Sequence, residues 1–550
     1  MNGLVSRRPM VGRAVGRLGS RLGVETGELI GLAAILAVAA AVRFANLPAR
    51  GGWDSDQGTE MLAMRNAVSG GGMPVFGPPA ISVGGTFHHG ALYYDLLLPA
   101  TWIGNGNPTF VVAEIALLSL LVVPIVWWIS RSIGGPAAGL MAAALAAVSA
   151  SLIGYATFIW NPTLVEPAAA VAFLGAWEAW RTGRPQWWLV AAAGSAVAMQ
   201  SHVAAGVIVV PMAAAFLAAL RRTPTGRRRR VAAWGVAAVA LVALSYLPVI
   251  AYESSHDFAE TRGMIGYFVG PDTTPARDPL TRVLFSAIRI LAWPLTRWPL
   301  VDLKTAFLPA AAVAVTLAVT LAWRVRRVGA PASGAEPAPD ADEARRAAVS
   351  ELDGLRFVGG MLLLVVLALG LGLKAVSEVQ ELPTEQYHVV ADPLVFVAAG
   401  VVLAGFWRAG GAGLARQMGR IAAVAAMAGL IAWNVGHWPP LDSPDGGWPA
   451  AQAAATRIEG IAAGAPVALV PLFEEKGSDA YAYPLQRDGV VLVDVARADT
   501  VVVLCDTFWL KGCSGQAESA WQATQPAGLT QVDRFAAAPD RIITVYRRSP

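Results

Sequence analysis

The sequence predicts a polytopic α-helical membrane protein that ends in a separate α/β domain. Of its 550 residues, 55% are hydrophobic and only 15% are charged, whereas soluble globular chains carry about 25% charge. About eleven apolar stretches approach the roughly 20 residues that a helix needs to cross the hydrocarbon core of a bilayer. The whole chain holds two cysteines, which excludes a disulfide-dense scaffold and a cysteine-rich metal module.

The apolar stretches follow a basic N-terminal segment, residues 1–27, and together form a transmembrane domain over 28–439. The predicted membrane spans are 29–46, 109–130, 136–158, 163–181, 187–200, 203–220, 231–251, 305–323, 357–376, 389–407 and 420–438. The stretch 90–104 is also apolar, but it is short and contains Asp95. The polar, low-complexity stretch 328–350 is expected to be a flexible cytoplasmic linker.

The arginines decide whether 90–104 crosses the membrane, because cytoplasmic loops carry an excess of Lys and Arg. If 90–104 does not cross and the N-terminus is cytoplasmic, every dense arginine cluster falls on the cytoplasmic side: 7–21, 131, 181–184, 221–230, 324–356 and 408–420. If it crosses, RRTPTGRRRR and RVRR lie outside. We therefore expect 90–104 to be an amphipathic helix on the outer surface. The arginine surplus then reflects topology and not nucleic-acid binding.

This topology places four segments outside the cytoplasm: 47–108, 252–304, 377–388 and the chain after about 439. The last of them, 440–550, combines a helical pattern from Trp448 to Ala463 with the strand-like runs VALVPLF, GVVLVDV, TVVVLCD and IITVYRR. That combination predicts a small extracytoplasmic α/β domain. Cys505 and Cys513 lie in it, and an oxidising compartment favours a disulfide between them. A buried free thiol at Cys505 is the alternative.

The first outer loop begins with two closely spaced carboxylates, Asp54 and Asp56, and Glu60 follows one helical turn later. The spacing of EMLAMRNAV predicts a helix that starts near Asp56, so Asp56 is a candidate helix cap. The alternative is catalytic, because a carboxylate placed against a hydroxyl can act as a general base.

Histidines and other polar residues gather on the same side of the predicted membrane. His88 and His89 lead into the surface helix, where they could contact a phosphate, bind a metal or serve only the structure. All six histidines fall outside or at the outer ends of spans. Ionisable groups at membrane depth usually line a cavity. Polar residues at the outer span ends are Asn161, Glu166, Gln200, His202, Glu385, Gln386, Tyr387, His388 and Asp392.

Four motifs stand in a definite order along the chain. They are Asp56-Gln57 followed by GTEMLAMRNAVSGGGMPVF, then His89-Gly90-Ala91-Leu92-Tyr93-Tyr94, Asn161-Pro162 and EQYHVVADP. In these motifs, and in its layout over most of 28–440, the chain resembles the GT-C glycosyltransferases of the protein-mannosyltransferase and aminoarabinose-transferase kind (glycosyltransferase family 39, bacterial branch). Two positions depart from the family pattern, since Gln57 replaces a Glu and Asn161 replaces a frequent Asp. An amide cannot act as a base, so a second catalytic carboxylate would have to be Asp54, Glu60 or Glu166.

The resemblance implies transfer of one hexose or pentose from a polyprenyl-phosphate carrier to an acceptor hydroxyl at the outer face of a bacterial plasma membrane. Asp56 would act as the base with inversion at the anomeric carbon, and Asp54 is the second expected catalytic residue. The departing phosphate needs hydrogen-bond donors placed in advance, for which His89 is the matched candidate and Arg262 a further option. The expected substrate-binding residues are Glu60, Arg65, His88, His89, Tyr93, Asn161, His202, Tyr387 and His388.

The resemblance requires no cofactor, although a divalent metal remains an alternative. Two other functions stay open at this point. A transporter or flippase would place charges at the bilayer midplane and show related halves, whereas a non-catalytic scaffold would only present the C-terminal domain. The sugar is not defined by the sequence, and the acceptor could be an envelope glycan, a lipid or a protein.

Overall fold

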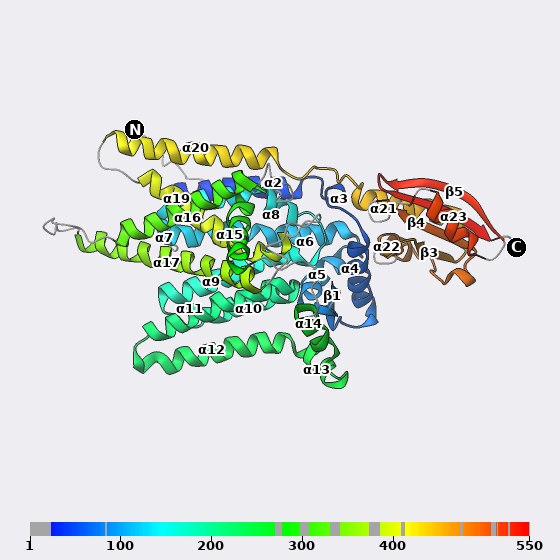
Figure 1. Ribbon diagram of the computed structural model, residues 1–550, viewed down its shortest axis with the longest axis horizontal. Helices are drawn as coiled ribbons and strands as arrows, with labels where there is room; N and C mark the ends of the chain where they lie inside the picture. The colour runs from blue at the N-terminus through cyan, green and yellow to red at the C-terminus, as the bar shows by residue number, and fades with distance from the viewer. Residues whose placement is uncertain are drawn as a thin grey trace, which may run out of the picture.

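The computed structural model describes residues 24–82, 85–269, 278–297, 307–329, 341–372, 385–408, 413–473, 477–507, 513, 515–525 and 528–548. Long helices lie side by side in a bundle, and a four-stranded sheet lies beyond one end of that bundle (Figure 1). The short elements of the first loop, residues 47–108, lie between the bundle and the sheet. The chain therefore has a helical body, an intermediate layer and a C-terminal unit.

Seven helical segments in the described part of the chain are long and apolar enough to cross a membrane. They are α2 (Thr26–Phe44), α6 (Pro108–Leu120) with α7 (Val122–Val148), η3 (Val203–Ile208) with α11 (Val209–Arg222), α16 (Phe307–Gly329), the Glu351–Gly372 part of α17 (Ala341–Gly372), η5 (Val389–Ala391) with α19 (Asp392–Arg408), and α20 (Leu414–Gly436). The bent pair α12 (Thr225–Ser245) and α13 (Leu247–Ser255) can be counted as an eighth span. These helices confirm the predicted class of membrane protein, while the number of eleven spans stays a prediction.

Shorter helices complete the bundle. They are α8 (Ala150–Tyr155), α9 (Val165–Thr182), α10 (Trp187–Ser201) and α15 (Pro279–Thr296), whereas α14 (Ala259–Val269) packs against the hairpin strand β2 (Gly85–Gly90). Helices α9 and α10 match the predicted spans 163–181 and 187–200, and they pack closely because a Cβ at Gly175 would overlap with the backbone of Ala191. Helix α15 was not predicted within the segment 252–304, yet it packs against α16 and α17.

The first loop contains more regular structure than the sequence predicts. Its elements are α3 (Leu47–Arg50), α4 (Ser55–Asn66), the π-helical turn η1 (Ala67–Gly71), β1 (Phe76–Ser82), β2 (Gly85–Gly90) and α5 (Leu92–Ile103). The antiparallel hairpin of β1 and β2 is new. Helix α5 is the predicted surface helix 90–104, and its 12 residues span only about 18 Å, which is too short to cross a bilayer.

The C-terminal unit, residues 447–548, folds around the sheet of order β3-β4-β6-β5. Its elements are α21 (Gly447–Ala462), β3 (Val467–Pro471), α22 (Asp479–Arg487), η6 (Val495–Arg497), β4 (Thr500–Asp506), α23 (Gln516–Ala523), β5 (Leu529–Ala538) and β6 (Arg541–Arg548). Strands β3 and β4 are parallel and the other pairs are antiparallel. Three of the four strand-like runs are confirmed, but GVVLVDV forms only the single bridge of Val467 with Leu492. Strand β5 has an exposed, weakly alternating sequence and was not predicted.

The arginine-rich connections lie at the end of the bundle opposite the C-terminal unit. At that end lie the link between α11 and α12, the end of α16, the start of α17, the end of α19 and the start of α20 (Figure 1). Part of the predicted linker 328–350 is helical instead, because α17 begins at Ala341. The sequence ADEARRAAVS consists largely of strong helix formers, which explains this correction. Residues 330–340 lie outside the described residues.

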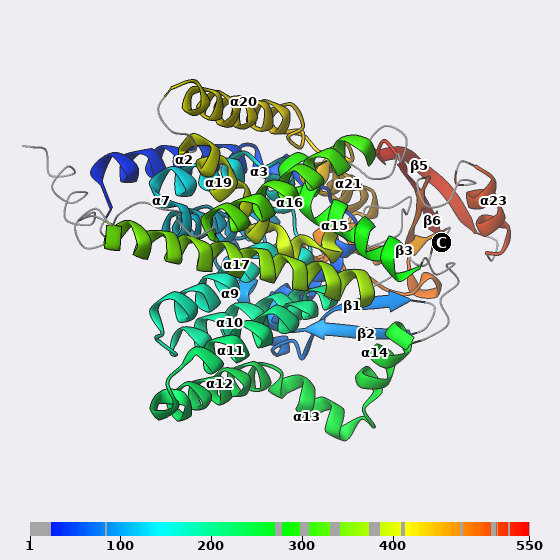
Figure 2. The same ribbon diagram turned by 60° about the vertical axis from the view of Figure 1, so that its left-hand side comes forward.

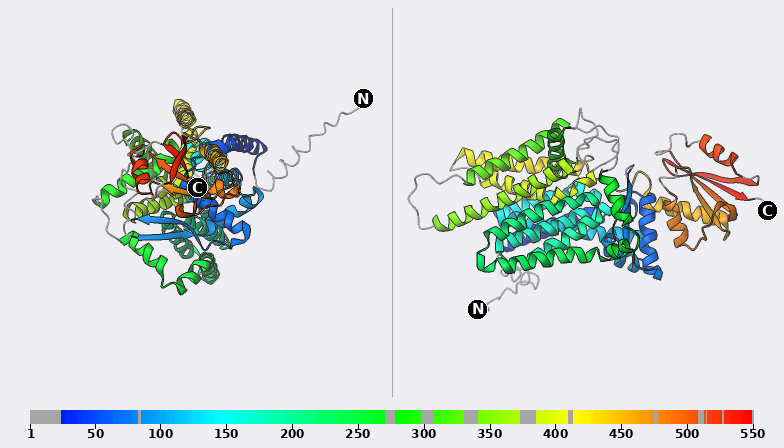
Figure 3. Two further views of the ribbon diagram at one scale, coloured as in Figure 1. Left: turned by 90° about the vertical axis from the view of Figure 1, so that its right-hand side faces the viewer. Right: turned by 60° about the horizontal axis from the view of Figure 1, so that its bottom comes forward.

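The C-terminal unit and the first loop share one apolar core. Trp53, Trp448 and Tyr483 belong to the same buried cluster, and the ring centroids of the two tryptophans are 4.6 Å apart. Figure 3 shows the blue first loop against the orange start of the C-terminal unit. Burial of three large aromatic side chains at one junction favours a fixed contact between the two parts.

Candidate functional site

Helix α4 carries the two leading acidic candidates, but its cap differs from the prediction. Asp54 has an extended backbone and is the N-cap, since its carboxylate accepts a hydrogen bond from the backbone N–H of Ser55. Gln57 completes a capping box by accepting from the backbone N–H of Asp54 at 2.8 Å. Asp56 is therefore not the cap, and its side chain is exposed on the first turn. The helix starts two residues earlier than expected because Asp54 and Gln57 satisfy its first N–H groups reciprocally.

Glu60 lies one turn after Asp56 on the same face of α4, and it is buried. The Tyr93 hydroxyl from α5 donates a hydrogen bond to its carboxyl group. Burial raises the pKa of Glu60 to about 8, and the nearby charge of Asp56 adds to the effect. Burial also raises the pKa of Tyr93 well above its usual range. At neutral pH the site thus holds a protonated carboxyl group beneath an exposed one.

The two amides that depart from the family pattern have structural partners. The Gln57 Nε2 donates to the carbonyl oxygen of Ile159 at 2.8 Å. The Asn161 Nδ2 donates to the carbonyl oxygen of Ser201 at 2.6 Å. Asn161 belongs to η2 (Asn161–Leu164), so these bonds attach α4 and the end of α10 to the same segment. Both amides hold the frame of the site, and neither can serve as a base.

His88 and His89 lie on β2 but point to different partners. The His88 Nδ1 is 3.0 Å from Glu260 Oε1, and the His88 backbone N–H donates to Glu260 Oε2 at 2.7 Å. Figure 2 shows β2 beside α14, the helix that carries Glu260. His89 is buried next to His202, with ring centroids 5.4 Å apart. Burial, and then the charge of His88, lower the pKa of His89 to about 4, so His89 is neutral at pH 7 and keeps one N–H to donate.

A cavity of about 570 Å³ lies beside this histidine pair. Its wall combines apolar side chains with a few polar ones, and it is formed by Phe87, His88, His89, Gly90, Met199, Val203, Gly206, Val207, Tyr246, Val249, Glu253, Glu260, Thr261, Met264 and Gly372. Cavities of roughly 300–1,000 Å³ with this composition are typical of small-molecule sites. Residues 88–93 connect the cavity to the carboxyl groups, because His88 and His89 line it and Tyr93 binds Glu60.

The remaining predicted residues divide into two groups. His202 and Tyr387 are near the cavity, since their ring centroids are 5.4 Å apart and His202 also contacts His89. His388 instead lies buried beside Trp293.

Arg65 and Asp54 point away from the histidines. Arg65 donates to the carbonyl oxygen of Arg487 in the C-terminal unit. Asp54 lies 3.7 Å from Arg541 of the same unit. Arg262 lies exposed on α14, the helix that contacts β2. The structure therefore does not gather all predicted substrate contacts around one point.

Sequence reasoning did not predict that Arg43 is buried in the bundle near two of the predicted polar residues, Glu166 and Asp392. Arg43 is fully buried and donates to three carbonyl oxygens, of Ala39, Ala146 and Ala147. Glu166 and Asp392 are both buried nearby. The signal was Arg43 at the end of an otherwise apolar stretch, because a buried charge needs partners. Glu253 and Glu260 of the cavity wall were also missed, because neither belongs to a recognisable sequence motif.

The two cysteines form a predicted disulfide, and metal ligands were an open alternative. Cys505 and Cys513 form a disulfide, as predicted, with their Cα atoms 5.5 Å apart. Within the described ranges, no group of three or more His, Cys, Asp or Glu side chains is arranged to hold a metal ion.

Comparisons with known proteins define the fold. Residues 100–252 match the family model of dolichyl-phosphate-mannose-protein mannosyltransferases. The chain is similar to the structures of ArnT from Cupriavidus metallidurans in the apo state and bound to undecaprenyl phosphate. The TM-scores are 0.56 and 0.57, at 14% and 15% sequence identity, over 93% and 95% of this chain and 97% and 98% of the ArnT chains. The protein has the GT-C fold.

A third structure has the same GT-C fold. It is the Archaeoglobus fulgidus oligosaccharyltransferase tethered with an acceptor peptide, with a TM-score of 0.51 and 12% identity over 96% of this chain and 74% of that chain. No curated protein matches the sequence. The GT-C fold confirms the resemblance predicted from the four motifs.

Proposed function

We propose that the protein is a glycosyltransferase that moves a sugar from a polyprenyl-phosphate donor to an acceptor hydroxyl at the outer face of a bacterial plasma membrane. The observation that carries the proposal is the pair of Asp56 and Glu60 on one face of α4. Glu60 binds Tyr93, which follows three residues after Gly90 of a largely apolar cavity wall. The GT-C fold and the match to a mannosyltransferase family model support it.

The donor is assigned from the chemistry of the cavity. Its largely apolar wall suits a prenyl chain. A similar protein, ArnT from Cupriavidus metallidurans, binds undecaprenyl phosphate. His89 donates a hydrogen bond to the phosphate, because a neutral imidazole still presents one N–H. Glu253 and Glu260 give part of the wall negative charge, so the phosphate lies on the His89 side.

The reaction follows from the protonation of the two carboxyl groups. Asp56 takes the proton of the acceptor hydroxyl while the hydroxyl oxygen attacks the anomeric carbon. The bond between the anomeric carbon and the lipid phosphate oxygen breaks, and the electron pair leaves with the phosphate. Attack opposite to the leaving group inverts the anomeric configuration. Burial raises the pKa of Glu60 to about 8, so Glu60 holds its proton at neutral pH and the role of base falls to Asp56.

The proposal also assigns the sides of the membrane. The loop 47–108 and the C-terminal unit face outward, and the arginine-rich connections face the cytoplasm, as the positive-inside rule requires. Residues 28–439 then form the catalytic membrane domain.

The decisive experiment measures release of undecaprenyl phosphate by the purified full-length protein. The donors are undecaprenyl-phosphate-linked mannose, glucose and arabinose, and the acceptor is an octyl glycoside. We expect Asp56→Asn to lower turnover by about 10²–10⁴-fold, the range of general-base catalysis, without loss of folded protein. Asp494→Asn, an exposed carboxylate of the C-terminal unit, is the matched control and should turn over at the normal rate. Normal turnover by Asp56→Asn refutes the assigned base, and no turnover of any donor by the wild type refutes the function.

A further inference from the structure

The C-terminal unit holds the beginning of α4 at nearly every residue that surrounds Asp56. The hydrogen bonds are from Trp53 Nε1 to the carbonyl oxygen of Ala480 at 2.7 Å, from Ser55 Oγ to the carbonyl oxygen of Gly477 at 3.0 Å, and from Thr59 Oγ1 to Asp479 Oδ2 at 2.6 Å. Gly58 lies directly against the backbone of Asp479. The first turn of α4 is therefore built jointly by the first loop and by residues more than 400 positions later.

Arg541, the first residue of β6, is the charged centre of this contact. Its Nε donates to Asp506 Oδ2 on β4 at 3.1 Å, and a terminal nitrogen lies 3.7 Å from Asp54 Oδ2. Its guanidinium also donates to the carbonyl oxygen of Trp53. The side chain is only 15% exposed, so these bonds are largely shielded from water. One planar guanidinium thus links the sheet to the N-cap of α4, a task for which a fork of donors is suited.

The contact of Arg541 with the N-cap of α4 bears on the proposed reaction, because Asp56 lies two residues after that N-cap. Its side chain is exposed, and the direction in which its carboxylate points is set by where α4 begins. A cap that shifts changes the first turn of a helix first. A catalytic group displaced by about 1 Å can cost roughly 10²-fold in rate.

We propose that Arg541 is a positioning residue for Asp56, so that the C-terminal unit is part of the catalytic apparatus. The inference rests on the proposed function, since it gives Arg541 a role through the base assigned there. Arg541 does not touch the reacting atoms. It fixes Asp54 and the Trp53 carbonyl, and these fix the turn that presents Asp56 to the acceptor.

The test uses the full-length protein with the donors and acceptor named above. We expect Arg541→Gln to lower kcat by about 10–100-fold and to change KM for the donor by less than about threefold, because the cavity lies on other elements. Arg541→Lys should recover part of kcat, since an ammonium keeps the charge beside Asp54 but not the fork. Asp54→Asn retains a good cap and loses the ion pair. The double variant Arg541→Gln with Asp54→Asn should be no slower than Arg541→Gln alone, because both substitutions remove the ion pair of Arg541 with Asp54.

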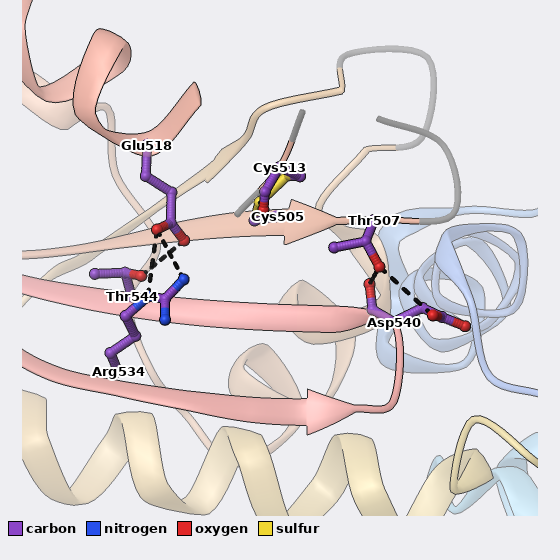
Figure 4. Close-up of a disulfide and its surroundings, with 7 residues drawn as sticks. All are labelled: Cys505, Thr507, Cys513, Glu518, Arg534, Asp540 and Thr544. Atoms are coloured by element: carbon purple, nitrogen blue, oxygen red, sulfur yellow. Dashed lines mark hydrogen bonds and ion pairs between the residues drawn. A yellow bond between two sulfur atoms is a disulfide. The ribbon is translucent and has the colours of Figure 1, made fainter. Parts of the chain in front are cut away.

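Arg534→Gln is the matched control in the same sheet. Arg534 on β5 lies 3.2 Å from Glu518 Oε2, and Thr544 donates to the same carboxylate. Figure 4 shows this cluster on the sheet, apart from the blue ribbon of the first loop. The variant removes a comparable arginine pair without touching α4, so kcat should stay normal.

Hydrogen exchange gives a readout that does not depend on turnover. We expect the amides of residues 54–60 to exchange about tenfold faster in Arg541→Gln and at the wild-type rate in Arg534→Gln. Unchanged exchange in Arg541→Gln, or a normal kcat in that variant while Asp56→Asn is inactive, overturns the positioning role. A normal kcat in Asp56→Asn would instead refute the assignment of Asp56 as the base. In that case the hydrogen exchange of residues 54–60 still tests whether Arg541 holds the first turn of α4.

Discussion

Asp56 and Glu60 are four residues apart on one helix, yet burial gives them different chemistry. Asp56 is exposed, whereas Glu60 is buried against Tyr93. A carboxyl group without water around it holds its proton, and the pKa of Glu60 rises to about 8. The spacing of these residues can be seen in the sequence, but the burial of one and the exposure of the other cannot.

The raised pKa of Glu60 predicts a pH-dependent stability. Between its ordinary value of 4.5 and about 8 the folded protein binds more protons than the unfolded chain. The free energy of unfolding must therefore fall as the pH rises through this window, by up to about 1.4 kcal/mol per pH unit. Glu60→Gln removes the titration, so its apparent Tm in detergent should fall less than that of the wild type from pH 5 to pH 8.

Glu459→Gln provides the control for this pH effect. Glu459 is an exposed carboxylate on α21, so this variant should follow the wild type at every pH. Parallel pH curves of the wild type and Glu60→Gln would contradict the protonated state of Glu60.

At the scale of elements, the position of α4 is set by its close contact with α22. A Cβ at Gly58 would overlap with the backbone of Asp479, so the two helices can meet only because residue 58 has no side chain. Thr59 and Asp479 then bond at 2.6 Å. The close approach explains how the C-terminal unit reaches the first turn of α4.

Gly58→Ala should separate these two helices. Overpacking of a tight contact typically costs about 1–3 kcal/mol, and here the strain falls on the helix that carries Asp56. We expect kcat to fall by at least about tenfold while the detergent-solubilised protein stays monodisperse. Gly460→Ala on α21 is the control, since a Cβ there meets nothing within 4 Å and alanine favours the helix. Equal kcat in the two variants would show that the contact is unimportant for turnover.

Elements with strong local signals were predicted, and those without them were not. The apolar helices and strands β3, β4 and β6 follow their sequence patterns. Strand β5 has an exposed, weakly alternating sequence, and it is a strand because β6 supplies its hydrogen bonds. GVVLVDV has the pattern of a strand but only one bridge with Val467. Whether such a segment becomes a strand depends on a neighbouring strand that pairs with it, and the sequence of the segment alone does not reveal that neighbour.

At the scale of the whole molecule, the chain separates its charges between two ends. The helix ends that flank the arginine-rich segments lie at one end of the bundle, and the first loop and the C-terminal unit lie at the other (Figure 1). This separation fits a membrane protein whose chemistry takes place on one side, because positive loops remain cytoplasmic.

Reporter fusions test the sides assigned to the two ends. Alkaline phosphatase fused after Pro550 should be active, because that enzyme folds only in an oxidising compartment. The same enzyme fused after Arg222, the last residue of α11, should be inactive, and a cytoplasmic fluorescent protein at that position should fold. The reverse pattern would invert the topology and place Asp56 on the cytoplasmic side.

The sequence by itself determined the class of protein, the grouping of arginines, a short helix within 90–104, the disulfide and the motifs that indicate a GT-C fold. These features are local, because apolar length, charge and short spacing do not depend on distant residues. Tertiary structure alone decided that Glu60 is buried while Asp56 is exposed, that Gln57 and Asn161 bond to distant carbonyl groups, and that Arg541 reaches α4. Each of these depends on which distant backbone lies within hydrogen-bond reach, and on which side chains lose their water, and neither is encoded in a single stretch of chain.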